Sequence, residues 1–293
     1  MDAAAVRTYQ YLRVGILALI AVLAVSLLVE ISRSTGPVCR GIAQCGSISA
    51  FFYTPVRTVF VGTLIATGFA LIVLRGRPGW EDVLLNVVGI LAVGVAIVPA
   101  PLQPGVVAAI TDTTAPTAPT VPSEFRPAVA NNVLAFGLIG LAGVAVALLL
   151  AARARELTTA NVTAISLTAV VLVGYMTWHA LGLESFLRAA HYVAAMPMFL
   201  IMAIIVEINA RASAARPRGK GLSQRQFAKT YRVLAVTMIA VLVAAVAIFL
   251  AQQVAGWVAP AGWLFWVEAI LIAQFGSFWL LQTLDYWQVG TPA

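Results

Sequence analysis

The stretch YRVLAVTMIAVLVAAVAIFLAQ, residues 231–252, decides the fold class of this chain. Arg232 is its only charged residue, and about 20 consecutive apolar residues are enough for a helix to cross a bilayer. Seven further stretches have the same character. The predicted spans cover residues 12–31, 55–75, 83–100, 131–152, 162–182, 191–210, 231–252 and 263–284. We therefore predict an all-α fold, a polytopic transmembrane bundle of eight spans that forms a single integral membrane domain over residues 1–293.

The composition excludes a soluble globular domain. Hydrophobic residues make up 61% of the chain and charged residues 10%, whereas charged residues are about a quarter of a soluble domain. The net charge of +7 could suggest a nucleic-acid partner, but the basic residues lie in loops beside apolar helices. Positive-inside topology explains them better, so we expect membrane lipids as partners and no nucleic acid.

The distribution of basic residues predicts the orientation. One side of the membrane receives Arg7, Arg13, Arg75, Arg77, Arg153, Arg155, Arg211, Arg216, Arg218, Lys220, Arg225, Lys229 and Arg232, and the other Arg33, Arg40, Arg57, Arg126 and Arg188. This bias places both termini in the cytoplasm and makes the span count even. The predominance of Arg over Lys, with abundant Ala, Val and Gly, suggests a bacterial inner or plasma membrane.

Three connections between spans are distinctive. The extracytoplasmic loop 99–130 carries seven prolines, which predicts an extended or polyproline-like segment that could fold down as a lid. The basic cytoplasmic loop 211–230 is expected to lie beside anionic lipid or to dock a protein partner. In the extracytoplasmic loop 32–54, Cys39 and Cys45 are the only cysteines. We predict a disulfide between them, with two free thiols as the alternative.

Four residues from distant parts of the chain are predicted to share one layer near the outer membrane face. They are Tyr53, Arg57, His191 and Glu268. Glu268 is expected about 8 Å inside its span. A carboxylate at that depth is costly, so it should be protonated, bonded to Arg57 or a histidine, or directed into a wet cavity. We predict a ligand-binding site there, against the alternatives of a structural Arg57–Glu268 ion pair and of His191 as an interfacial residue.

Other polar residues in apolar surroundings have simpler interpretations. Glu81 and Asp82 complement the dipole at the start of the third span, and Asn209 helps to balance nearby arginines. Small residues four apart, such as Gly62 with Ala66, favour close approach of helices. The chain lacks the usual histidine–glutamate zinc motifs and a glycine-rich phosphate loop, so we expect no metal and no cofactor.

Several motifs resemble known families. The run from Ser47 to Gly62, Trp80 to Asn86, and Phe265-Trp-Val-Glu268 look like uncharacterised bacterial multi-pass proteins of the DUF998 and Frag1 type. That resemblance implies no particular reaction. More distantly, the chain is similar to ceramidase-like membrane hydrolases, in which Ser47 or Ser49 and His191 would match catalytic residues, although no His-x-x-x-His pair is present.

Three functions remain open from the sequence. The first is a protein that binds a lipid or small amphiphile in an outer-leaflet pocket, or that serves as an accessory subunit of a membrane-protein partner. The second is a proton- or ion-coupled transporter with Glu268 as the titrating group. The third is a membrane lipid hydrolase with Ser47 or Ser49 as nucleophile and His191 as base. The sequence does not decide whether the protein is an enzyme.

Overall fold

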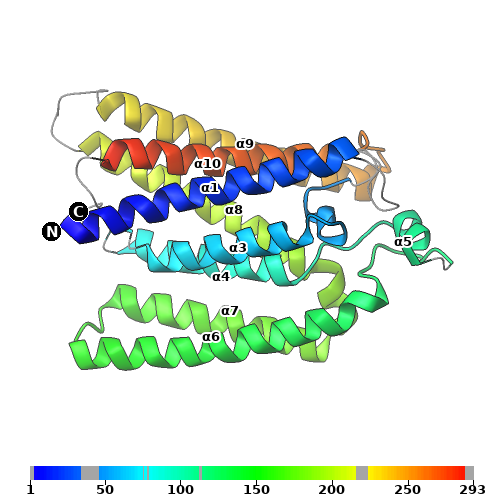
Figure 1. Cartoon of the computed structure of the whole chain (residues 1–293), viewed down its shortest axis with the longest axis horizontal. Helices are drawn as coiled ribbons and strands as arrows, with labels where there is room; N and C mark the ends of the chain where they lie inside the picture. Colours follow the sequence, from blue (N-terminus) through cyan, green and yellow to red (C-terminus); the bar gives the residue numbers. More distant parts are fainter. Residues whose placement is uncertain are drawn as a thin grey trace.

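A computed structural model describes residues 3–33, 46–74, 76–77, 79–111, 114–215 and 224–287, which form a bundle of long helices (Figure 1). The long helices are α1 (Ala3–Arg33), α3 (Arg57–Val73), α4 (Trp80–Ile97), α6 (Arg126–Ala154), α7 (Thr159–Leu181), α8 (Leu183–Ala215), α9 (Gln224–Ala255) and α10 (Trp263–Tyr286). Three short elements connect them: η1 (Ser49–Tyr53), α5 (Pro104–Thr111) and η2 (Ser123–Phe125). Over these ranges the only extended pairing is a single bridge between Leu102 and Thr120.

Each of the eight predicted spans falls on one of these long helices. Within the described ranges, seven helices are long and apolar enough to cross a membrane, which confirms an all-helical bundle of multi-pass character. The shorter apolar helix is α3, with 17 residues. At 1.5 Å per residue it is about 25 Å long, less than the roughly 30 Å of a hydrocarbon core. An eighth crossing by α3 therefore stays a prediction.

The two ends of the bundle differ in what they hold. The beginning of α1 and the end of α10 lie together, and the Gln10 side chain donates a hydrogen bond to the carbonyl of Trp287 at 2.8 Å. We name this the proximal end. The opposite, distal end holds η1, α5 and η2 (Figure 1). The chain runs back and forth between these two ends, so residues that are far apart in sequence can meet at the same end.

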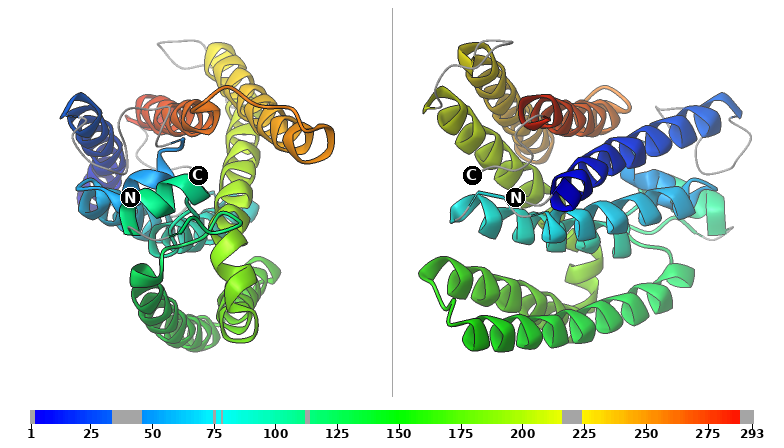
Figure 2. Two further views of the ribbon diagram at one scale, coloured as in Figure 1. Left: turned by 90° about the vertical axis from the view of Figure 1, so that its right-hand side faces the viewer. Right: turned by 60° about the vertical axis from the view of Figure 1, so that its left-hand side comes forward.

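The helices are arranged around α4. Figure 2 shows α6 and α7 as a pair on one side of α4, with α1, α9 and α10 on the other and α8 crossing between them. Two-thirds of the apolar window of α4 is buried inside the protein, against 6% for α7. The exposed apolar side chains of α6 and α7 are suited to contact lipid, while α4 is enclosed by other helices.

The backbones of α3 and α4 approach each other at Gly68 and Gly89. A Cβ added at Gly89 would lie 2.5 Å from the carbonyl oxygen of Gly68, and one added at Gly68 would lie 2.6 Å from that of Gly89. Only glycine permits this contact. The expectation of a close approach at Gly62 is wrong, because a Cβ there would meet no atom within 4 Å.

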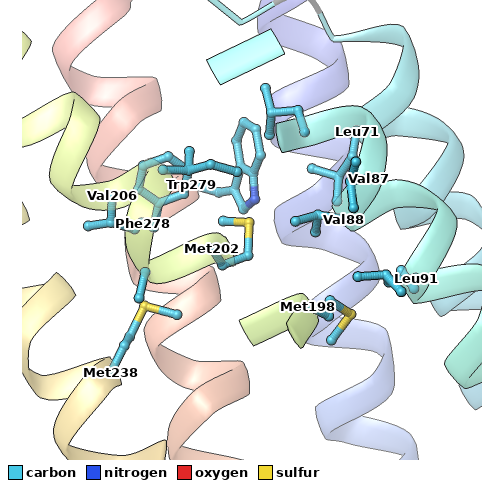
Figure 3. Packing of buried hydrophobic residues seen from close by; sticks show 14 of the residues in the cluster. Leu71, Val87, Val88, Leu91, Met198, Met202, Val206, Met238, Phe278 and Trp279 are labelled. Atoms are coloured by element: carbon cyan, nitrogen blue, oxygen red, sulfur yellow. The ribbon is translucent and has the colours of Figure 1, made fainter. Parts of the chain in front are cut away.

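A layer of large apolar side chains fills the middle of the bundle. Its members are Leu85, Met202, Val206, Phe278 and Trp279, which we name the apolar plug. Figure 3 shows Met202 between Leu71 and Val88 on one side and Phe278 and Trp279 on the other. The plug side chains come from α4, α8 and α10, so the plug joins α4 to the helices on its other side.

The proline-rich loop contains more helix than predicted. The proline-rich segment is not extended throughout, because α5 begins at Pro104, a residue well suited to the first helical position. The Leu102–Thr120 bridge and buried Val121 fold the segment onto the distal end. In the basic segment, α8 extends to Ala215 and α9 begins at Gln224. The predicted Cys39–Cys45 disulfide lies outside the described residues.

Candidate functional site at the distal end of an axial cavity

A narrow cavity runs along the axis of the bundle and encloses about 130 Å³. Its walls come from α1, α3, α4, α8 and α10, with Ala245 of α9 at one edge. On α10 the lining extends from Leu264 to Phe275, eleven residue steps or about 16 Å along the axis. Tyr192, which also lines it, is 36% exposed, so the cavity is not fully closed at its distal end.

The lining is almost entirely apolar, and its acidic group lies at the distal end. Glu268 and Ser49 face the cavity together there, while Leu71, Val88 and Met202 line its proximal part. On α10 the last lining residue is Phe275, and the next buried residues towards the proximal end are Phe278 and Trp279 of the apolar plug, which Figure 3 shows beside Met202. A cavity with an apolar length and one hydrogen-bonding end is the kind of site that holds an amphiphile.

Local backbone contacts explain why Ser49 meets Glu268. The first N–H groups of a helix have no partner within it, and the N–H of Phe265 in α10 donates to the carbonyl of Gly46 at 2.9 Å. Gly46 takes a positive φ of 74°, a conformation that glycine adopts without strain. This contact holds the segment before η1 against the first turn of α10, next to Glu268.

A continuous chain of hydrogen bonds links three helices through Ser49. Glu268 accepts from the Ser49 N–H through Oε2 at 3.1 Å and contacts the Ser49 hydroxyl through Oε1 at 3.0 Å. Nε2 of His191 lies 2.9 Å from the same hydroxyl. Nδ1 of His191 lies 2.7 Å from the carbonyl oxygen of Val98. His191 is 1% exposed and Ser49 7% exposed, so the protein itself supplies these contacts.

Counting protons limits the protonation states that this chain of hydrogen bonds can adopt. A carbonyl oxygen only accepts, so Nδ1 of His191 carries a hydrogen. If His191 is neutral, the Ser49 hydroxyl donates to Nε2, and Glu268 must be protonated to donate to Ser49. If His191 is an imidazolium, Nε2 donates to the Ser49 hydroxyl, the hydroxyl donates to Glu268, and Glu268 is a carboxylate. The two states have the same net charge and differ by the transfer of one proton from Glu268 to His191 through Ser49, and the apolar surroundings favour the neutral one.

Three of the four predicted ligand-binding residues, Tyr53, Arg57 and His191, lie outside the cavity lining, and His191 reaches it only through Ser49. The Tyr53 hydroxyl donates to the carbonyl of Ala100 at 2.9 Å, and burial raises the pKa of this phenol, which keeps it a donor. The Arg57 guanidinium lies over the ring of Phe52 at 4.6 Å and over that of Phe125 at 5.2 Å. These contacts attach η1 and the beginning of α3 to η2. A ligand contact of Tyr53 or Arg57 stays a prediction.

The structure contains some of the contacts predicted for Glu268. Glu268 contacts Ser49, and through Ser49 it is linked to a histidine, His191. The structural Arg57–Glu268 ion pair is not formed, because Arg57 is held by aromatic rings. The alternative of His191 as an interfacial residue is wrong: α8 begins at Leu183, eight residues earlier, so His191 is two turns inside the helix and fully enclosed.

A second polar network, at the proximal end, is missing from the sequence interpretation. Glu81 is 2% exposed and accepts a hydrogen bond from the Asn209 amide at 2.9 Å. The Asn209 oxygen in turn accepts from Gln282 at 3.4 Å. The interpretation that Glu81 serves only to complement the dipole of its helix is therefore incomplete. The amides Asn209 and Gln282, each inside a predicted span, were the available signal, and only the packing of α4, α8 and α10 brings them together with Glu81.

Comparison of the chain with protein-family models, with curated proteins and with solved structures finds no match. The similarity of its motifs to the DUF998, Frag1-type and ceramidase-like families stays a prediction. The functional argument therefore depends on the geometry of the axial cavity and of the Glu268–Ser49–His191 chain.

Proposed function

We propose that the protein binds a single-chain amphiphile in the axial cavity. The hydrocarbon chain lies between α1, α3, α4, α8 and α10, and a hydrogen-bonding head group lies at Glu268 and Ser49. One observation carries the proposal: an apolar cavity about 16 Å long has its acidic group at one end. For comparison, an apolar cavity of roughly 150 Å³ in another protein stays dry and takes up benzene.

The orientation proposed for this site follows from the basic residues. Positive-inside topology with eight spans puts the proximal end in the cytoplasm and the distal end outside. The head group would then lie at the level of the outer leaflet of a bacterial cell membrane. Tyr192 marks the partly open distal side of the cavity, through which a lipid could enter.

The apolar plug favours binding over transport through the bundle. Phe278 and Trp279 lie on α10 between the cavity-lining Phe275 and Gln282 of the proximal network. On α8, Val206 likewise lies between Met202, which lines the cavity, and Asn209, which belongs to the proximal network. A polar solute or proton would have to cross this dry layer to reach the proximal end, whereas a bound amphiphile would enter and leave on the distal side.

The test is a displacement assay on the purified chain in nanodiscs, with a fluorescent analogue of a short-chain fatty acid as probe. Ala92 is 2% exposed and lines the cavity, so Ala92→Trp should fill it and weaken binding at least about tenfold, or 1.4 kcal/mol. Thr67→Phe, from α3, is a second filling variant. Ala147→Trp on the exposed face of α6 is the matched control. Equal affinity in the filled and control variants would refute the proposal.

A further inference from the structure

We infer that Ser49 is a nucleophile that accepts an acyl group, and that the distal end of the cavity hydrolyses a single-chain lipid ester. The inference rests on the proposed function, because the cavity must take the acyl chain. It adds ester hydrolysis to the proposed binding of an amphiphile. It also distinguishes Ser49 from Ser47, whose hydroxyl is occupied as the acceptor of the Ala50 N–H at 3.0 Å.

The geometry is that of a nucleophile with its base and an orienting group. The Ser49 hydroxyl and Nε2 of His191 are 2.9 Å apart, within the 2.6–3.2 Å or so that such pairs require. The Val98 carbonyl at Nδ1 fixes the ring and its tautomer, the part that a carboxylate plays in a Ser-His-Asp triad. Ser49 lines the cavity, whereas His191 is not part of its lining and lies behind the serine.

Glu268 is a positioning residue in this scheme. It holds both the N–H and the hydroxyl of Ser49, which fixes the nucleophile at the cavity wall. In the neutral state the Ser49 hydroxyl donates to His191 and accepts from Glu268, and its second lone pair remains for a carbonyl carbon. Tyr192 also lines the cavity, and this scheme assigns its hydroxyl as the donor to the carbonyl oxygen.

The reaction balances with water as the second substrate. Oγ of Ser49 bonds to the ester carbonyl carbon while its proton passes to Nε2 of His191. The bond from that carbon to the alcohol oxygen breaks, and the alcohol leaves with the proton from His191. Water then attacks the acyl carbon and gives a proton to His191. The bond to Oγ breaks, Ser49 recovers the proton, and a fatty acid is released.

The shape of the cavity indicates the substrate class. With the carbonyl at Ser49, a single acyl chain would extend towards Leu71 and Met202, and the alcohol would lie at the open side near Tyr192. A lipid with two chains would have to leave one outside. An ester with one short acyl chain, such as a short-chain monoacylglycerol, fits this description.

The test uses a fluorophosphonate with a short alkyl chain on the full-length protein in nanodiscs, read by intact mass and peptide mapping. Ser49 should be modified in the wild type, His191→Gln should slow the modification at least about tenfold, and Ser49→Ala should abolish it. Ser277→Ala, which removes an exposed serine of α10, should label like the wild type. Hydrolysis of a monoacylglycerol should be lost in the same variants that lose labelling.

Displacement of the fluorescent amphiphile separates this inference from the proposed function. It also shows that Ser49→Ala and His191→Gln are folded, since both should still bind the amphiphile. If the fluorophosphonate displaces the amphiphile but leaves Ser49 unmodified, the inference is overturned and the proposed function stands. Modification of another serine instead of Ser49 also overturns the inference. If the probe neither displaces the amphiphile nor reacts, the inference is rejected, and amphiphile binding alone decides the proposed function.

Discussion

One methyl group at the crossing of α3 and α4 should have a large effect on stability. In Gly89→Ala the new Cβ would lie 2.5 Å from the carbonyl oxygen of Gly68 and 2.7 Å from Cγ1 of Ile72. Ordinary contact begins at 3.4 Å, so the two backbones would have to separate by about 0.9 Å at this point. Ile72 can rotate, but a carbonyl bonded within its own helix cannot. Overpacking of this kind costs about 1–3 kcal/mol.

The matched control is Gly62→Ala in α3. Both changes gain the roughly 1 kcal/mol by which alanine is favoured over glycine inside a helix, so the gain cancels when the variants are compared. Nothing lies within 4 Å of a Cβ at Gly62. The difference in unfolding free energy between the two variants should therefore be about 1–3 kcal/mol.

The measurement is denaturant unfolding in one detergent, followed by circular dichroism. Gly89→Ala should also weaken binding of the fluorescent amphiphile, because α3 and α4 both line the cavity. A Gly89→Ala protein as stable as Gly62→Ala would refute the close crossing. Unchanged binding in a clearly destabilised Gly89→Ala protein would show that the crossing does not shape the cavity.

The remaining predictions concern single polar contacts and are measured by the same unfolding assay. Asn209→Ala should cost about 1–3 kcal/mol or more, because it leaves the buried Glu81 carboxylate without its amide donor. Tyr53→Phe should cost about 1 kcal/mol through loss of the hydrogen bond to Ala100, and an unchanged protein would contradict that contact. Glu184→Gln removes an ion pair whose glutamate side chain is 64% exposed, and it should change stability by less than about 1 kcal/mol.

The membrane bundle could be predicted because its signal is local. Each span needs only a run of about 20 apolar residues, and every predicted segment falls on a helix. Helix ends were less accurate: α8 begins at Leu183, where the sequence indicated 191, because Leu183, Phe186 and Leu187 continue the apolar pattern across Glu184 and Arg188. The proline-rich loop was only partly predicted, since proline opens a short helix there as readily as it extends a chain.

The site required the tertiary structure. Topology alone put Glu268 and His191 in one layer, but it also put Tyr53 and Arg57 there, and only the first two are joined. Their bridge, Ser49, lies just ahead of the second span, and the sequence offered it only as an alternative to Ser47, through the resemblance to ceramidase-like hydrolases. Its position depends on a backbone contact 219 residues away in sequence, and linear spacing carries no record of such contacts. The sequence by itself determined that this chain forms helices suited to lipid, because burial of apolar surface is additive along each helix. Which polar groups meet inside the bundle was decided by helix rotation, glycine crossings and loop docking, which depend on all the helices at once.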